Sequence, residues 1–164
     1  LFGYPVTIIT KTLKNAQVNA LWWELRRKAV VSEIPAQNAY RPCVRALRQN
    51  GLVGFMLDQN RPADQGVFVD FFGRPASTTP GLAFMAAQTG APVVPVFMRR
   101  RPDGRHLLEA RPALEPPPDR EEATIREHTA RYTRIIEDEI RLHPEQWLWF
   151  HKRWKSRPAG EAAG

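Results

Sequence analysis

Short apolar runs rich in β-branched residues alternate along this chain with longer segments whose apolar residues recur at helical spacing. This alternation restricts the possible folds more than any other feature. The first run, residues 5–10, is apolar on both faces, as the buried strands of parallel sheets are. Asn15 follows as a potential N-cap, and helical spacing of apolar residues begins at Val18. The beginning of the chain therefore predicts a strand followed by a helix.

The same rhythm continues to the end of the chain. Asn50 and Gly51 are expected to end one helix with a left-handed cap, and Gly90 another. Gly73 and Pro75 are expected to end a strand, and a helix is expected to begin at Pro80 after a Thr78 or Thr79 cap. We predict a three-layer α/β domain with a mostly parallel mixed sheet. Further strands are expected at residues 30–34, 52–57, 66–72, 92–100 and 106–110, the last two joined as a hairpin, and further helices at residues 41–49, 80–89 and 125–140.

Length and composition limit the class of protein. With 164 residues, the chain is expected to form a single domain over residues 1–164. The single cysteine, Cys43, excludes an internal disulfide. The longest nearly apolar stretch, residues 91–98, contains two prolines and falls far short of the roughly 20 residues of a membrane-spanning helix. The net charge of +7 favours anionic partners.

Several kinds of chemistry lack their residues. No serine lies in a Gly-x-Ser-x-Gly turn, and the four histidines show no spacing typical of metal ligands. No glycine-rich phosphate loop with a following lysine is present. We therefore expect neither a metal nor a nucleotide cofactor.

Two long stretches, residues 50–99 and 143–158, resemble the bacterial lipid A biosynthesis acyltransferases of the lysophospholipid acyltransferase superfamily. The resemblance is carried by the strand that ends in Asp58 and Gln59, the block GVFVDFFGRPASTTPG, the strand VVPVF, and the late PEQW and HKRWK segments. An earlier run, KTLKN at residues 11–15, resembles a basic segment of the same family.

The resemblance implies an acyltransferase that moves a fatty acyl chain from acyl carrier protein to a hydroxyl of a phosphorylated glucosamine lipid in lipopolysaccharide biosynthesis. It also implies a site of action at a membrane surface, the cytoplasmic face of the inner membrane. One alternative is another enzyme of the superfamily that acts on a glycerophosphate or a phosphoinositol glycolipid. A further alternative is a basic α/β module that binds nucleic acid, since aromatic and cationic residues alternate near the end of the chain.

The catalytic motif of the family is absent from this sequence. That motif is a histidine, four residues, and then Asp or Glu, in which the carboxylate orients the imidazole as a general base. The fifth residues after the four histidines are instead Arg111, Thr133, Leu148 and Ser156. We therefore expect the catalytic pair, which this sequence does not identify, to lie in an N-terminal part that precedes Leu1, where the family usually also carries a membrane anchor.

The remaining site residues follow from the resemblance and from charge. Asp58 resembles an acidic residue of the superfamily, and a carboxylate at this position is expected to orient either a cation or an acceptor hydroxyl, with a structural ion pair as the alternative interpretation. The arginines of residues 99–105 are expected either to meet the acidic carrier protein or to form a solvated turn. Predicted substrate-binding residues are Lys11, Lys14, Asn15, Asp58, Gln59, Arg74 and Thr78, and predicted membrane-interface residues are Trp147, Trp149, Trp154 and Lys155, although half of the aromatic side chains of this segment are alternatively expected to pack on the domain.

Overall fold

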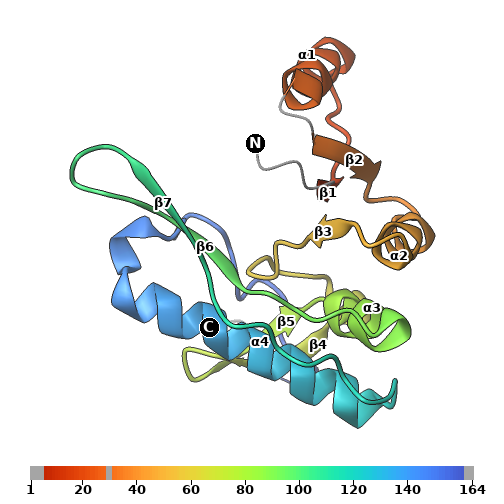
Figure 1. Cartoon of the computed structure of the whole chain (residues 1–164). Helices are drawn as coiled ribbons and strands as arrows, with labels where there is room; N and C mark the ends of the chain where they lie inside the picture. Colours follow the sequence, from red (N-terminus) through yellow and green to blue (C-terminus); the bar gives the residue numbers. More distant parts are fainter. Residues whose placement is uncertain (1–5, 29–30, 161–164) are drawn as a thin grey trace. The chain divides into compact units, whose positions relative to one another are not determined.

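The computed structural model describes residues 6–28 and 31–160, and the chain divides into two compact units. Residues 1–56 belong to the first unit and residues 57–164 to the second (Figure 1). The α/β class is confirmed, because helices and strands alternate and the first sheet is parallel. The grouping of the whole chain into one domain stays a prediction.

The first unit is a three-stranded parallel sheet with its connecting helices. The strand order is β2-β1-β3, so that β1 is central and pairs with both neighbours. Sequence-expected strands at residues 5–10 and 30–34 are thus confirmed over their described residues. The elements are β1 (Val6–Thr10), α1 (Ala16–Lys28), β2 (Val31–Pro35), α2 (Tyr40–Arg48) and β3 (Leu52–Gly54).

Both predicted caps of this unit are present. The Asn15 side-chain oxygen accepts hydrogen bonds from the backbone N–H groups of Gln17 and Val18, at 3.0 and 3.1 Å, and so begins α1. Asn50 lies in the left-handed region at φ 58°, and the Gly51 N–H reaches back to the Ala46 carbonyl at 2.9 Å beyond the end of α2.

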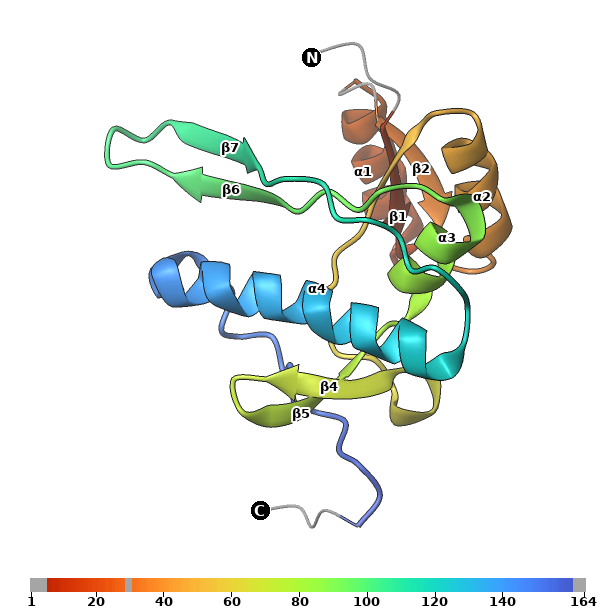
Figure 2. The same ribbon diagram turned by 60° about the horizontal axis from the view of Figure 1, so that its bottom comes forward.

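The second unit packs two antiparallel hairpins and a short helix around one long helix. Figure 2 shows α4 between the β4–β5 hairpin and the β6–β7 hairpin. One side of the core gathers Leu57, Ala83, Ile125 and Tyr132, and another gathers Phe71, Ala76 and Ile140. The elements are η1 (Ala63–Gln65), β4 (Val67–Phe71), β5 (Arg74–Thr78), α3 (Gly81–Thr89), β6 (Val96–Arg100), β7 (His106–Ala110), α4 (Glu122–Leu142) and η2 (Pro144–Gln146).

The predicted strand end at Gly73 is confirmed, since β4 ends at Phe71, but the predicted break at Pro75 is wrong. The chain instead makes a two-residue turn at Phe72 and Gly73, both at positive φ, and Pro75 lies inside β5 opposite Asp70. In such a hairpin the pair that closes the turn, Phe71 and Arg74, exchanges hydrogen bonds, and the next pair does not. Because Pro75 lies in a pair that does not exchange hydrogen bonds, its missing N–H removes no hydrogen bond from the hairpin.

The other predicted boundaries of the second unit hold to within a few residues. Gly90 ends α3 in the left-handed region at φ 70°. Helix α3 begins at Gly81, whose N–H donates to the Thr79 hydroxyl at 3.3 Å, whereas Thr78 belongs to β5. The predicted hairpin is confirmed as β6 and β7. No helix among the described residues combines the length and apolarity needed to cross a membrane.

Glu137 of α4 holds the β4–β5 turn. Its carboxylate accepts the Phe72 N–H at 2.7 Å and two hydrogen bonds from Arg141, whose guanidinium lies 4.7 Å from the centre of the Phe72 ring. Burial by itself raises the pKa of Glu137, but the Phe72 N–H, the Arg141 hydrogen bonds and the nearby Arg134 charge outweigh it and lower the pKa. The ionised form therefore stabilises a turn in which a bulky residue has positive φ.

We predict that Glu137→Gln lowers the free energy of unfolding at pH 7 by about 1–2 kcal/mol. Because the carboxyl pKa is lower in the folded protein than its ordinary 4.5, the ionised contact stabilises above pH 4.5 and is lost as the pH falls through the folded pKa. Urea unfolding at pH 7 and pH 3 should thus show a smaller acid loss in the variant than in the parent.

The control is Asp138→Asn, which removes an exposed carboxylate from the same helix. It should change the free energy of unfolding at pH 7 by less than about 0.5 kcal/mol. Equal acid losses in the parent and Glu137→Gln would contradict the role of Glu137.

Candidate functional site

The loop that begins at Asp58 is held by the last segment of the chain, residues 147–156, in the second unit. The indole N–H of Trp147 donates to the Asp58 carboxylate at 3.2 Å. Asn60 and Ser156 are joined by two hydrogen bonds, each at 3.1 Å. The side-chain nitrogen of Asn60 donates to the Ser156 hydroxyl, and the backbone N–H of Ser156 donates to the side-chain oxygen of Asn60. Two of the stretches that carry the sequence resemblance therefore form one structure.

These contacts between the loop that begins at Asp58 and residues 147–156 are called the clamp below. His151 is part of the clamp. Its Nε2 accepts the backbone N–H of Asn60 at 2.9 Å, so this ring nitrogen carries no proton in the arrangement described. A nitrogen that is already committed to a backbone donor is not free to take a proton from a substrate hydroxyl. His151 is therefore a structural hydrogen-bond acceptor.

Arg153 lies at the centre of the site and is fully buried. One terminal nitrogen donates to the Ser77 carbonyl at 2.8 Å, and the other donates to the Thr78 hydroxyl. The guanidinium carbon lies 5.1 Å from the centre of the Phe71 ring. Burial lowers the pKa of Arg153 to about 10, against the opposing attraction of Asp58, so the side chain keeps its positive charge at neutral pH.

Two of the predicted membrane-interface residues pack around Phe71. The ring centres of Trp147 and Trp154 lie 5.8 and 5.6 Å from that of Phe71, and the Trp154 indole N–H donates to the Phe71 carbonyl at 3.3 Å. Trp149 is 52% exposed and Lys155 is also exposed. This agrees with the alternative that half of these aromatic side chains pack on the domain, and the interfacial role stays a prediction.

The predicted substrate-binding residues occur in both units. In the first unit, Lys11 and Lys14 are exposed between β1 and α1, and Asn15 caps α1. The structure thus gives Asn15 a local structural role in addition to the predicted one.

In the second unit, Gln59 and Arg74 are exposed, and the Arg74 guanidinium lies over the Trp154 ring at 5.4 Å. Asp58 is half-buried beside Trp147. Thr78 is fully buried, and its hydroxyl donates to the Ala76 carbonyl while it accepts from Arg153. In this structure the Thr78 hydroxyl is a hydrogen-bond acceptor for Arg153, and its predicted contact with substrate stays a prediction.

The other histidines have no carboxylate partner within hydrogen-bond distance among the described residues. His128 lies 3.4 Å from the Tyr132 hydroxyl, and His106 is exposed in β7. His143 lies 2.6 Å from an Arg99 nitrogen and 4.0 Å from a Glu145 oxygen. The described residues also contain no cluster of three His, Cys, Asp or Glu side chains that would hold a metal ion.

Sequence reasoning missed the residues that build the clamp. The sequence does not mark Asn60 and Ser156 as structural partners. Arg153 lies in the HKRWK segment that carries the resemblance, but it belongs to a basic run that is typical of a solvated surface. Only the fold shows that this one cation of the run is buried.

Comparison with known proteins identifies relatives over most of the chain. Residues 2–156 match the family described as "Bacterial lipid A biosynthesis acyltransferase". A lipid A biosynthesis acyltransferase of Haemophilus influenzae is 30% identical over 97% of this chain and 49% of its own length. The lipid A biosynthesis lauroyltransferase of Escherichia coli K12 is 35% identical over 71% of the chain and 38% of its own length. The palmitoleoyltransferase of that organism is 34% identical over 77% and 41%. The chain thus spans about half the length of the curated relatives it matches, or less.

We predict that Arg153→Ala lowers the free energy of unfolding by about 2–4 kcal/mol, because it leaves the Thr78 hydroxyl and the Ser77 carbonyl without their buried hydrogen-bond donor. The matched control is Lys155→Ala, an exposed cation two residues away, with an expected change within about 0.5 kcal/mol. Urea unfolding followed by tryptophan fluorescence measures both. Equal stability of the two variants would rule out Arg153 as the centre of the site.

Proposed function

Because this chain belongs to the bacterial lipid A biosynthesis acyltransferase family, we propose that it takes part in the transfer of a fatty acyl chain from acyl carrier protein to a hydroxyl of a phosphorylated glucosamine lipid. The resemblance noted in the sequence is confirmed by the family match. The named relatives are acyltransferases, among them a lauroyltransferase and a palmitoleoyltransferase. For this protein, the identity of the acyl donor, the identity of the acceptor and the transfer itself are proposals.

One observation carries the proposal for this structure. The two stretches that resemble the family fold against one another, and Arg153 joins the end of β5 to the last segment of the chain. Asp58 and Arg74 are thereby attached to one rigid frame, Asp58 through Trp147 and Arg74 through Trp154. A frame of this kind positions an acceptor, which is the part of acyl transfer that depends on orientation.

We assign separate tasks to the polar side chains. The exposed Arg74 binds a phosphate of the acceptor, since guanidinium groups match phosphate oxygens in charge and geometry. Within the same unit, the Gln59 amide supplies a further contact to the anionic lipid. Lys11 and Lys14 of the first unit are proposed separately as residues that bind anionic lipid. Asp58, fixed by Trp147, orients the acceptor head group. The base that removes the hydroxyl proton is not among these residues.

The proposed place of action is the cytoplasmic face of the inner membrane. A lipid acceptor lies in a membrane, whereas an acyl carrier protein is a soluble acidic donor. The net charge of +7 favours encounter with that donor and with anionic lipid. Exposed Trp149 and Lys155 suit an interface.

We predict that residues 1–164 alone give no measurable transfer from acyl carrier protein, because none of the four histidines is followed five residues later by Asp or Glu. The chain should still bind a phosphorylated glucosamine lipid weakly, and binding should fall as salt rises. Arg74→Ala should weaken it about three- to tenfold. The measurement is titration of the lipid in detergent at two salt concentrations.

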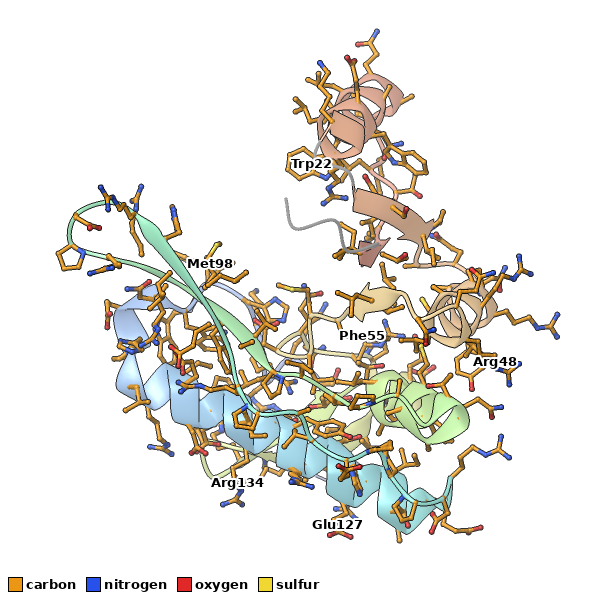
Figure 3. The ribbon with its side chains drawn as sticks, in the orientation of Figure 1. Trp22, Arg48, Phe55, Met98, Glu127 and Arg134 are labelled. Atoms are coloured by element: carbon orange, nitrogen blue, oxygen red, sulfur yellow. The ribbon has the colours of Figure 1, made fainter. Side chains whose placement is uncertain are left out.

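Arg134→Ala, which removes an exposed cation from α4 (Figure 3), is the control and should leave the affinity within about twofold. Equal affinity for the dephosphorylated lipid would contradict the acceptor assignment. Tighter binding of a lysophosphatidic acid would favour a glycerophosphate acceptor instead. Robust transfer would place catalysis in residues given structural roles above, with His106, His143 and His151 the first to test.

A further inference from the structure

A pocket of about 630 Å³ lies between the β6–β7 hairpin and the end of α4, within the second unit. Three consecutive arginines at the end of β6, Arg99, Arg100 and Arg101, line it from one side. His143, which precedes η2, and Gln146, the last residue of η2, line the pocket from the other side. None of the predicted substrate-binding or membrane-interface residues lines this pocket.

Arg99, one of the lining arginines, belongs to an electrically balanced group of four charged side chains next to the pocket. Arg99 forms ion pairs with Glu109 and, at 3.5 Å, with Glu139. Arg111 binds the same two carboxylates at 2.8 and 2.9 Å. Two cations thus meet two anions, and Arg99 is held in place without being available to neutralise an additional anion.

Arg100 and Arg101 give the pocket lining an excess of positive charge. The Gln146 side chain fixes the Arg100 backbone, accepting its N–H at 2.7 Å and donating to its carbonyl at 2.9 Å. Among the described residues, no carboxylate lies within ion-pair distance of the Arg100 or Arg101 guanidinium. Glu145 is the single carboxylate of the lining. The backbone of these cations is therefore positioned while their charges stay free for a ligand.

Exposed apolar side chains lie on the β6–β7 hairpin and in the segment around η2, the two parts of the chain that line the pocket. On the hairpin, Met98 (Figure 3) and its cross-strand partner Leu108 are 66% and 65% exposed. Near η2, Leu142 and Leu148 are each 66% exposed, and Phe150 is 95% exposed. The same two parts of the chain therefore present free positive charge and large exposed apolar side chains, a combination that favours a partner with both an anionic and an apolar part.

We propose that this pocket binds the phosphate of an anionic lipid head group, with the flanking apolar side chains inserted at the level of the head groups of a bilayer. Binding at a membrane interface has two components. Cations attract the phosphates of the lipids, and apolar side chains leave water for the bilayer. A strongly acidic protein would pair with Arg100 and Arg101 but would leave Met98, Leu108 and Phe150 against polar surface. The combination of charge and apolar surface therefore favours a lipid over a protein.

This site is independent of acyl transfer, so its test uses neither an acyl donor nor an acceptor. The 164-residue chain is sedimented with vesicles of phosphatidylcholine alone and of phosphatidylcholine mixed with phosphatidylglycerol. We expect binding to the mixed vesicles only. The double variant Arg100→Ala/Arg101→Ala should weaken it about 30-fold, at roughly a factor of five for each cation near an anionic surface.

The matched control removes the same charge elsewhere. Arg126→Ala/Arg131→Ala takes two exposed cations from α4 and should change vesicle affinity by less than about threefold. A second variant, Met98→Ser/Leu108→Ser, keeps every charge and should also weaken binding to mixed vesicles. All three variants alter exposed side chains, and their melting temperatures should match that of the parent chain.

Three outcomes would overturn the proposal. Equal loss in the two arginine double variants would mean that net charge, rather than the pocket, attracts the vesicles. Phosphate binding is measured separately by titration with inorganic phosphate. If Arg100→Ala/Arg101→Ala reduces phosphate binding but leaves vesicle binding unchanged, the pocket is assigned to a free phosphate. Loss of binding to acyl carrier protein in that variant, with vesicle binding intact, would assign the surface to the acidic protein.

Discussion

The charge of Arg153, buried away from water, is the constraint on which the second unit depends. An ion without solvent costs several kcal/mol, and this cost must be offset inside the protein. The Ser77 carbonyl, the Thr78 hydroxyl, the Phe71 ring and the Asp58 charge supply that compensation. Each of these groups lies about 75 residues or more before Arg153, so the last segment of the chain and the β4–β5 hairpin stabilise one another.

Helix α4 extends this arrangement to the other hairpin. Residues two positions apart on a helix point about 200° apart, which is nearly to opposite sides. Glu137 therefore binds the turn of the β4–β5 hairpin, whereas Glu139 binds Arg99 of β6 and Arg111, which follows β7. One helix thus fixes both the frame that carries Asp58 and Arg74 and the basic pocket beyond it. The proposed acceptor contact and the proposed lipid pocket share a support while remaining chemically separate.

Local signals in the sequence predicted much of the fold. Asn15 and Gly90 act within one helical turn, and the predicted cap and helix end are both confirmed. Strand β5 was not predicted, because Pro75 is tolerated only when the register of the whole hairpin is known. The predicted site residues came from resemblance, and their long-range partners, such as Arg153 for Thr78, depend on tertiary packing that no local pattern records.

The most direct test of this account is a double-mutant cycle between Arg153 and Thr78. Replacing Trp22 and Trp23 of the first unit with phenylalanine leaves tryptophan only in the second unit, so that fluorescence reports its unfolding in urea. Arg153→Met, Thr78→Val and the double variant are then compared in this background. The account predicts a coupling free energy of about 1–3 kcal/mol. Additive effects of the two substitutions would contradict it.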